Sequence, residues 1–251
     1  GGGGTGSGTI GWLVKSLKER IDKPIYVIIV LPYAFEERGD TSFAVMNTAT
    51  CLNTVSRYAD TVFLVDNERY RKAGANLSRN LQEVNKEIAA SFYDLCCAGE
   101  ETRQKFIGSK VMDAGDIKQS LEGISTVGLG LTHLPVFKLR KTNYRDGIKE
   151  QSSTLAALYQ AEGNFGLSVR LEDARKLLVL ISAPKDAISV STLEEVTNFL
   201  QQKSPKAVIR IGDYPRRRHE ISVTLIASLL TNVNRVESLF LRAEELFKIR
   251  Q

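Results

Sequence analysis

The sequence predicts an α/β protein whose first half is a parallel sheet and whose second half is an α+β unit with a mixed sheet. Three observations lead to this fold class. Apolar strand-like runs alternate with amphipathic stretches over residues 1–98, the stretch 76–97 has the periodicity of a single long helix, and beyond residue 120 the strand-like runs lie closer together. Alternation of strands and helices is typical of a parallel sheet, whereas closely spaced strands favour a mixed one.

The first half contains the clearest strand signals. Continuous apolar runs occur at Ile25–Leu31, before Pro32, and at Thr61–Val65, before Asp66. Such runs are typical of parallel strands that are buried on both faces. Amphipathic periodicity predicts helices over Thr9–Arg20 and Asn76–Cys97.

The segment 99–115 is polar and punctuated by glycine, as expected of a domain boundary. We therefore divide the chain into 1–98, a connection at 99–119, a second domain at 120–232 and a final helix at 233–251. The strands expected beyond the boundary are Thr126–Leu131, Val136–Arg140, Leu167–Leu171, Leu177–Ile181, Ala207–Ile211 and Ile221–Ile226. The helices expected there are Ile148–Ala161, Thr192–Gln202 and Asn234–Arg250, the last of them amphipathic.

Composition argues against several classes of function. The net charge of +5 is spread along the chain, and its one tight basic run, Arg216–Arg218, is interpreted as a solvated loop, so no nucleic-acid partner is expected. The three cysteines make an odd count that predicts no disulfide framework, and no spacing fits a metal site. The lack of a disulfide framework favours the reducing cytoplasm, and because no apolar run reaches the ~18 residues of a membrane span, no membrane insertion is expected.

The chain begins with a glycine-rich segment, Gly1–Gly8, that leads into the first helix. A flexible linker is the simplest interpretation, but such a loop is also an anion site, because glycine lets phosphate approach the backbone N–H groups at the helix start. Thr5 and Ser7 could add hydroxyl donors. A P-loop would need a lysine here, which is missing. A Rossmann oxidoreductase would need a preceding strand and an acid after the next one, and NAD-induced thermal stabilisation would reveal it.

The string Gly2-Gly3-Gly4-Thr5-Gly6-Ser7-Gly8 resembles, letter for letter, the signature G-G-G-T-G-[S/T]-G of the FtsZ/tubulin superfamily. The resemblance implies that these seven residues surround the phosphates of GTP or GDP, with Mg²⁺. It extends to about Leu230, and the final helix is more like the archaeal FtsZ-like proteins of the CetZ group.

Further resemblances follow in the order that the superfamily has them. Glu36 lies in a loop similar to the one that reaches the ribose, although a solvated acidic loop is an alternative. Asn67 ends a stretch similar to D-N-E and is expected to contact guanine, the alternative being a turn or helix cap. Leu81 and Asn85 match the positions that stack on the base and read it. Leu81 replaces an aromatic residue, which puts strict guanine selectivity in doubt.

The segment from Val111 to Asp116 resembles the catalytic loop N-x-D-x-x-[D/E] of the superfamily. The resemblance implies that Asp113 and Asp116 enter the nucleotide site of the next subunit and polarise the attacking water. Two carboxylates three residues apart at a helix start can also be simple capping groups. Val111 departs from the asparagine of the pattern, so hydrolysis could be slower.

Taken together, these features predict a self-assembling GTPase that forms head-to-tail filaments and serves cell division or cell-shape control. The alternative is a non-catalytic member that binds nucleotide or partners and scaffolds or caps filaments. The strands and loops that precede the signature in the superfamily are not found in the sequence. We therefore expect the chain to be part of a longer protein, to which the GTPase activity is assigned.

Overall fold

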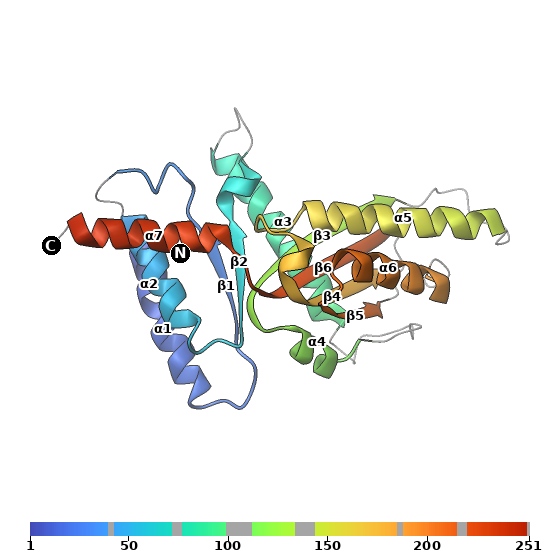
Figure 1. The fold of residues 1–251 in the computed structure, drawn as a ribbon, viewed down its shortest axis with the longest axis horizontal. Coiled ribbons are helices and arrows are strands. Elements are labelled where there is room, and N and C mark those ends of the chain that lie inside the picture. Colours follow the sequence, from blue (N-terminus) through green and yellow to red (C-terminus); the bar gives the residue numbers. More distant parts are fainter. Residues whose placement is uncertain are drawn as a thin grey trace.

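The computed structural model describes residues 1–39, 43–71, 77–98, 112–133, 144–184, 188–214 and 220–249 (Figure 1). The helices of these residues are α1 (Gly4–Lys18), α2 (Phe43–Val55), α3 (Leu77–Ala98), α4 (Ala114–Ser120), α5 (Tyr144–Gly163), α6 (Val190–Lys203) and α7 (Asn234–Ile249), with short 3₁₀ turns η1 (Asn67–Tyr70) and η3 (Leu171–Asp173). The strands are β1 (Tyr26–Leu31), β2 (Thr61–Asp66), β3 (Gly123–His133), β4 (Ala174–Ser182), β5 (Val208–Asp213) and β6 (Glu220–Leu230).

All six strands form one sheet in the order β1-β2-β3-β6-β4-β5. The first three strands run parallel, β6 is antiparallel to both of its neighbours, and β4 and β5 are parallel. The parallel first half and the mixed second half that the sequence predicted are therefore confirmed, but they share a continuous sheet. The seam between them is short, because β2 and β3 pair only through Thr61–Phe63 and Gly123–Ser125.

Helices cover the sheet from both sides. One apolar core joins β1 and β2 to α1, α2 and α7 and, farther along the sheet, joins β4 and β6 to α5 and α6. A second core on the other face joins Phe63, Val127 and Leu178 to Leu95 of α3 and Leu121, which follows α4. Figure 1 shows α1, α2 and α7 grouped beside β1 and β2, with α5 and α6 beside the second half of the sheet.

Helix α5 lies unusually close to β3. A Cβ atom added at Gly130 would overlap the carbonyl oxygen of Ala157. It would also lie only 2.8 Å from the carbonyl carbon of Ala157 and from the backbone nitrogen of Ala161. Gly128 faces the next turn of the same helix in a similar way. The two glycines therefore allow backbone-to-backbone contact between strand and helix, which no larger residue permits.

Three details of the sequence prediction are wrong. Helix α1 begins at Gly4 and not at Thr9, so more than half of the expected loop Gly1–Gly8 is helical. Leu167–Leu171 is not a strand, although Leu167 and Leu171 are buried. Just before this segment, the backbone of Gly166 bridges β2 and β3 through hydrogen bonds with Asp66 and Val127. Strand β1 is buried on one face only, because Tyr26 and Ile28 are exposed.

Two further expectations, the strand Val136–Arg140 and the basic run Arg216–Arg218, lie outside the described residues.

Candidate functional site

The glycine-rich start of the chain lies beside the carboxyl ends of the first two strands. The backbone nitrogen of Gly1 donates to the carbonyl oxygen of Val30 at 2.6 Å. The loop after β1 contacts the turn after β2, since the backbone N–H of Ala34 donates to Glu68 Oε2 at 3.0 Å. The carboxyl edge of a parallel sheet is where α/β proteins place their ligands. We call this end of the molecule, at the top of Figure 1, the strand-end face.

The glycines of the segment Gly1–Gly8 fall into two groups. A Cβ at Gly1 or Gly2 would press against Thr48 or Ala44 of α2, so these two glycines serve packing. A Cβ at any of the others (Gly3, Gly4, Gly6 and Gly8) would meet nothing within 4 Å. Glycine within a helix is less favourable than alanine by roughly 0.5–1 kcal/mol. No close packing inside the chain requires glycine at these open positions.

The N-terminus of α1 offers backbone donors at this place. Gly3 is its N-cap and supplies no side-chain hydrogen bond to the helix, so the first N–H groups of the helix have no side-chain cap there. The hydroxyl group of Ser7 donates to the carbonyl oxygen of Gly3. The sequence suggested that this hydroxyl would face phosphate, but in the structure it is bonded to the backbone.

Glu36 and Asn67 stand in the two loops that form the strand-end face. Glu36 Oε2 accepts the backbone N–H of Tyr33 at 2.8 Å, which closes the turn after β1. Asn67 is half-buried and opens η1, whose first turn is capped by Asp66. The structure thus brings these two predicted residues to the strand-end face.

Two predicted residues lie along α3. Asn85 is exposed, about 12 Å from the helix start at 1.5 Å per residue. Leu81 belongs to the same helix, but its side chain lies outside the described residues, as does the whole of Val111.

The acid pair forms a reciprocal capping box at α4. Asp113 Oδ1 accepts the N–H of Asp116 at 2.7 Å, and Asp116 Oδ2 accepts the N–H of Asp113 at 3.5 Å. Arg210 of β5 adds a cation, with its Nε atom 3.6 Å from Asp116 Oδ1. Asp113 and Asp116 therefore do act as capping groups, the alternative that the sequence left open. Arg210 was not among the predicted site residues, because it lies far from them in the sequence.

The acid pair and the strand-end face lie at opposite ends of the molecule. The 22 residues of α3 span about 33 Å at 1.5 Å per residue and run from the η1 end toward α4. Figure 1 shows α4 at the bottom and the loops after β1 and β2 at the top. Within one chain, Asp113 and Asp116 therefore cannot reach a ligand on the strand-end face.

Sequence analysis also missed a buried cation beneath the strand-end face. Arg235, in the first turn of α7, forms ion pairs with Asp66 and Glu37. Burial acts to lower the pKa of Arg235, but the hydrogen bond to Glu37 and the charges of both acids raise it overall. Burial raises the pKa of Asp66 despite the opposing effect of Arg235.

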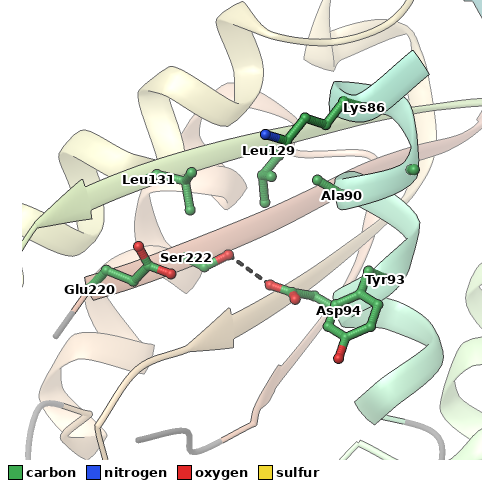
Figure 2. Close-up of a pocket in the computed structure, with 9 residues that line it drawn as sticks. Lys86, Ala90, Tyr93, Asp94, Leu129, Leu131, Glu220 and Ser222 are labelled. Carbon is green, nitrogen blue, oxygen red and sulfur yellow. Dashed lines mark hydrogen bonds between the residues drawn. The ribbon is translucent and has the colours of Figure 1, made fainter. Parts of the chain in front are cut away.

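A separate groove of about 380 Å³ lies under α3 (Figure 2). Its walls are Tyr93 and Asp94 of α3 and Leu129, Leu131 and Ser222 of the second half of the sheet. The hydroxyl of Ser222 donates to Asp94 Oδ2 at 2.8 Å, both residues being buried. The groove is thus the seam between α3 and the second half of the sheet, and its mainly apolar wall does not suit phosphate.

Two other kinds of site are absent from the described residues. No three His, Cys, Asp or Glu side chains gather there as a metal site would need. No helix in the same residues is both long and apolar enough to cross a bilayer.

A continuous sheet, a long helix between its two halves, and a glycine-rich helix start at the strand ends together define a tubulin-like protein. Comparison with solved structures agrees. CetZ1 of Haloferax volcanii, described as a GDP-bound monomer, superposes with a TM-score of 0.80 at 26% identity, covering 97% of this chain and 67% of that one. CetZ2 of the same organism, described as a GTPγS-bound protofilament, gives a TM-score of 0.80 at 28% identity, covering 99% and 69%.

Residues 74–245 match the family described as "Tubulin-like CetZ, C-terminal domain". The sequence is 30% identical to the tubulin-like protein CetZ2 of H. volcanii over 245 residues, which are 97% of this chain and 64% of the relative. The chain belongs to the tubulin-like CetZ family. It spans a little under two thirds of the length of the first curated relatives that it matches.

Proposed function

We propose that the full-length protein binds guanine nucleotide on the strand-end face, assembles head to tail, and hydrolyses GTP with acids supplied by the next subunit. The observation that carries this proposal is the separation of the strand-end face from Asp113 and Asp116 by the length of α3. A nucleotide and these acids can meet only when two copies stack end to end. The solved relatives described as GDP-bound and as a GTPγS-bound protofilament support both nucleotide and self-assembly.

The open glycines favour a phosphate group as ligand. With no Cβ at Gly3, Gly4 and Gly6, an anion can reach the N–H groups of the first turn of α1, where the helix dipole attracts negative charge. We assign the phosphates to Gly2–Gly8, including Thr5 and Ser7, the ribose to Glu36 and the base to Asn67, Leu81 and Asn85. Ser7 would have to rotate away from Gly3 before it could donate to phosphate.

The chemical step needs a water molecule placed in line with the γ-phosphate. We assign the orientation of this water to the carboxylates of Asp113 and Asp116 from the neighbouring copy, which accept its protons as it attacks. Both residues are at least partly exposed at the end of the molecule, as a contact in trans requires. Mg²⁺ is proposed as the counter-ion of the nucleotide, where it would neutralise phosphate charge, and we assign it no protein ligand.

A non-catalytic scaffold is the second candidate. The capping box favours it, because Asp113 and Asp116 already have a structural role within α4. A scaffold would use the same two ends for assembly and would bind nucleotide without turnover. Division and cell-shape control, both in the cytoplasm, remain the proposed settings for either function.

The decisive experiment separates capping from catalysis in the acid pair. Asparagine caps a helix about as well as aspartate, so Asp113→Asn and Asp116→Asn preserve the helix start while they remove the charges. In the full-length protein we expect GTP turnover per subunit to rise steeply above a threshold concentration. Each asparagine variant should lower that rate by about 100-fold and retain nucleotide binding. An unchanged rate would support the scaffold instead.

The phosphate assignment has its own test. Gly6→Ala should raise the thermal stability of the nucleotide-free protein, since alanine gains roughly 0.5–1 kcal/mol in a helix and meets nothing there. The same change should weaken GDP binding, because the methyl group stands where phosphate approaches. Gly163→Ala, at the end of α5 and equally open, is the matched control and should leave affinity unchanged. Unaltered GDP affinity in Gly6→Ala would contradict the assignment.

A further inference from the structure

Arg235 forms hydrogen bonds to both loops of the strand-end face, the one after β1 and the one after β2. Its Nε atom lies 3.1 Å from Asp66 Oδ2, and its Nη1 donates to Glu37 Oε2 at 3.0 Å. Its Nη2 bonds to the other oxygen of Glu37 and donates to the carbonyl oxygen of Pro32 at 3.1 Å. One guanidinium group thus joins the helix α7, the end of β2 and both ends of the turn after β1.

These contacts bracket Glu36 and Asn67, two of the residues assigned to the nucleoside. Pro32 and Glu37 flank the turn Tyr33–Glu36, which closes through the N–H of Glu36 and the carbonyl of Tyr33 at 2.9 Å. Asp66 uses its second oxygen, Oδ1, to accept the N–H of Glu68 at 3.1 Å and so caps the turn that begins with Asn67. A shift of Arg235 would therefore move both turns.

The position of Arg235 in its own helix is unfavourable, which calls for an explanation. It is the second residue of α7, where the helix dipole repels a cation. Its side chain and those of Asp66 and Glu37 are all at least four-fifths buried. A buried fork that satisfies two carboxylates and a carbonyl is a task for arginine and not for lysine.

Arg235 is also tied to the second half of the sheet. Three residues before it, the Asn232 side-chain amide donates to Asp173 Oδ1 at 2.9 Å, and Thr231 donates to the Asp173 carbonyl through its hydroxyl group at 3.1 Å. Asp173 directly precedes β4. Hydrogen bonds to Asp173, the residue before β4, therefore connect the start of this strand to the strand-end face through α7, on the opposite side of the sheet from α3.

We propose that Arg235 is a positioning residue that sets the two nucleoside-reading turns and couples them to the second half of the sheet through α7. This inference rests on the proposed function, because it concerns the nucleotide site assigned above. It predicts that Arg235 governs recognition of base and ribose and not of phosphate. The hydrogen bonds of Arg235 described above go to Asp66, Glu37 and Pro32 and not to the glycine-rich start of α1, so pyrophosphate is a probe of that start alone.

The test compares Arg235→Met with Arg242→Met in the full-length protein. Arg242 lies on the same helix in an exposed pair with Glu245, which makes it the matched control. Affinities for GDP, ADP and pyrophosphate are measured by calorimetry, with melting temperature in parallel. We expect Arg235→Met to weaken GDP about tenfold, since misplacement of about 1 Å already has large effects. The GDP-to-ADP preference should fall, while pyrophosphate affinity stays constant.

The outcomes separate the two proposals. If the unaltered protein shows no preference for GDP, the proposed function fails whatever Arg235 does. If it prefers GDP, but Arg235→Met changes GDP and pyrophosphate equally or changes neither, the positioning role is refuted. Should Arg235→Met not fold, Glu37→Gln and Arg235→Lys decide the matter, because each keeps part of the clamp and should lower the GDP-to-ADP preference by a smaller factor. No change in either would also refute the role.

Discussion

Replacement of Gly130 by alanine tests the packing that makes the second half of the sheet rigid. The new methyl carbon would lie 2.8 Å from the carbonyl carbon of Ala157 and the nitrogen of Ala161, whereas carbon atoms rest at about 3.5–4.0 Å. The nearest atom, the carbonyl oxygen of Ala157, would overlap the new methyl group, so helix α5 would have to withdraw by more than about 1 Å and its fully buried residue Leu158 would lose its fit. Overpacking costs about 1–3 kcal/mol, and since backbone stands on both sides we expect the upper end of that range.

The assay is urea and thermal unfolding followed by circular dichroism. A loss of about 3 kcal/mol corresponds to a melting temperature lower by roughly 6–12 °C in a protein of this size. Gly163→Ala is again the control, because its methyl group meets nothing within 4 Å and should not destabilise. A melting temperature of Gly130→Ala within about 1 °C of the unaltered protein would refute the close strand–helix contact.

Two further predictions concern buried carboxyl groups. The hydrogen bond from Arg170, assisted by Asn232, holds the pKa of Asp173 below its ordinary value. The contribution of Asp173 to stability is therefore present above the unfolded pKa of about 3.9 and is lost as pH falls through the folded pKa. The difference in melting temperature between the unaltered protein and Asp173→Asn should narrow below pH 4. A difference that stays constant with pH would contradict this. Ser222→Ala removes a hydrogen bond from Asp94 and should lower the free energy of unfolding by about 1–2 kcal/mol, measured in urea; no loss would show that the bond does not tie α3 to the sheet.

The parts of the fold that depend on local pattern were predictable. Apolar runs bounded by turn residues predicted β1 and β2, and helical periodicity predicted α3 and α7. Exposure of Tyr26 and Ile28 was not predictable, since an apolar run does not reveal whether its second face is covered. The strand expected over Leu167–Leu171 was wrong because Leu167 and Leu171 are buried although their backbone forms no strand.

The site divides in the same way. The glycine signature and the acid pair are short strings, so a sequence alone reveals them. The contacts of Arg235 join residues 169 and 198 positions apart, and no local pattern carries that information. The extension of α1 to Gly4 was missed because glycine is a poor helix former, and here the packing of Gly11 on Thr54 and of Val14 in the core holds the helix in place.

The short seam between β2 and β3 has a mechanical consequence. β1 and β2 pair along six residues and β3 and β6 along eight, but the two halves of the sheet meet through three. The two halves of the sheet are therefore joined along a narrow strip, with α3 packed on one face of the sheet and α7 on the other. When tension is applied between the two ends of the molecule, the strip around Thr61–Phe63 should yield before either half deforms.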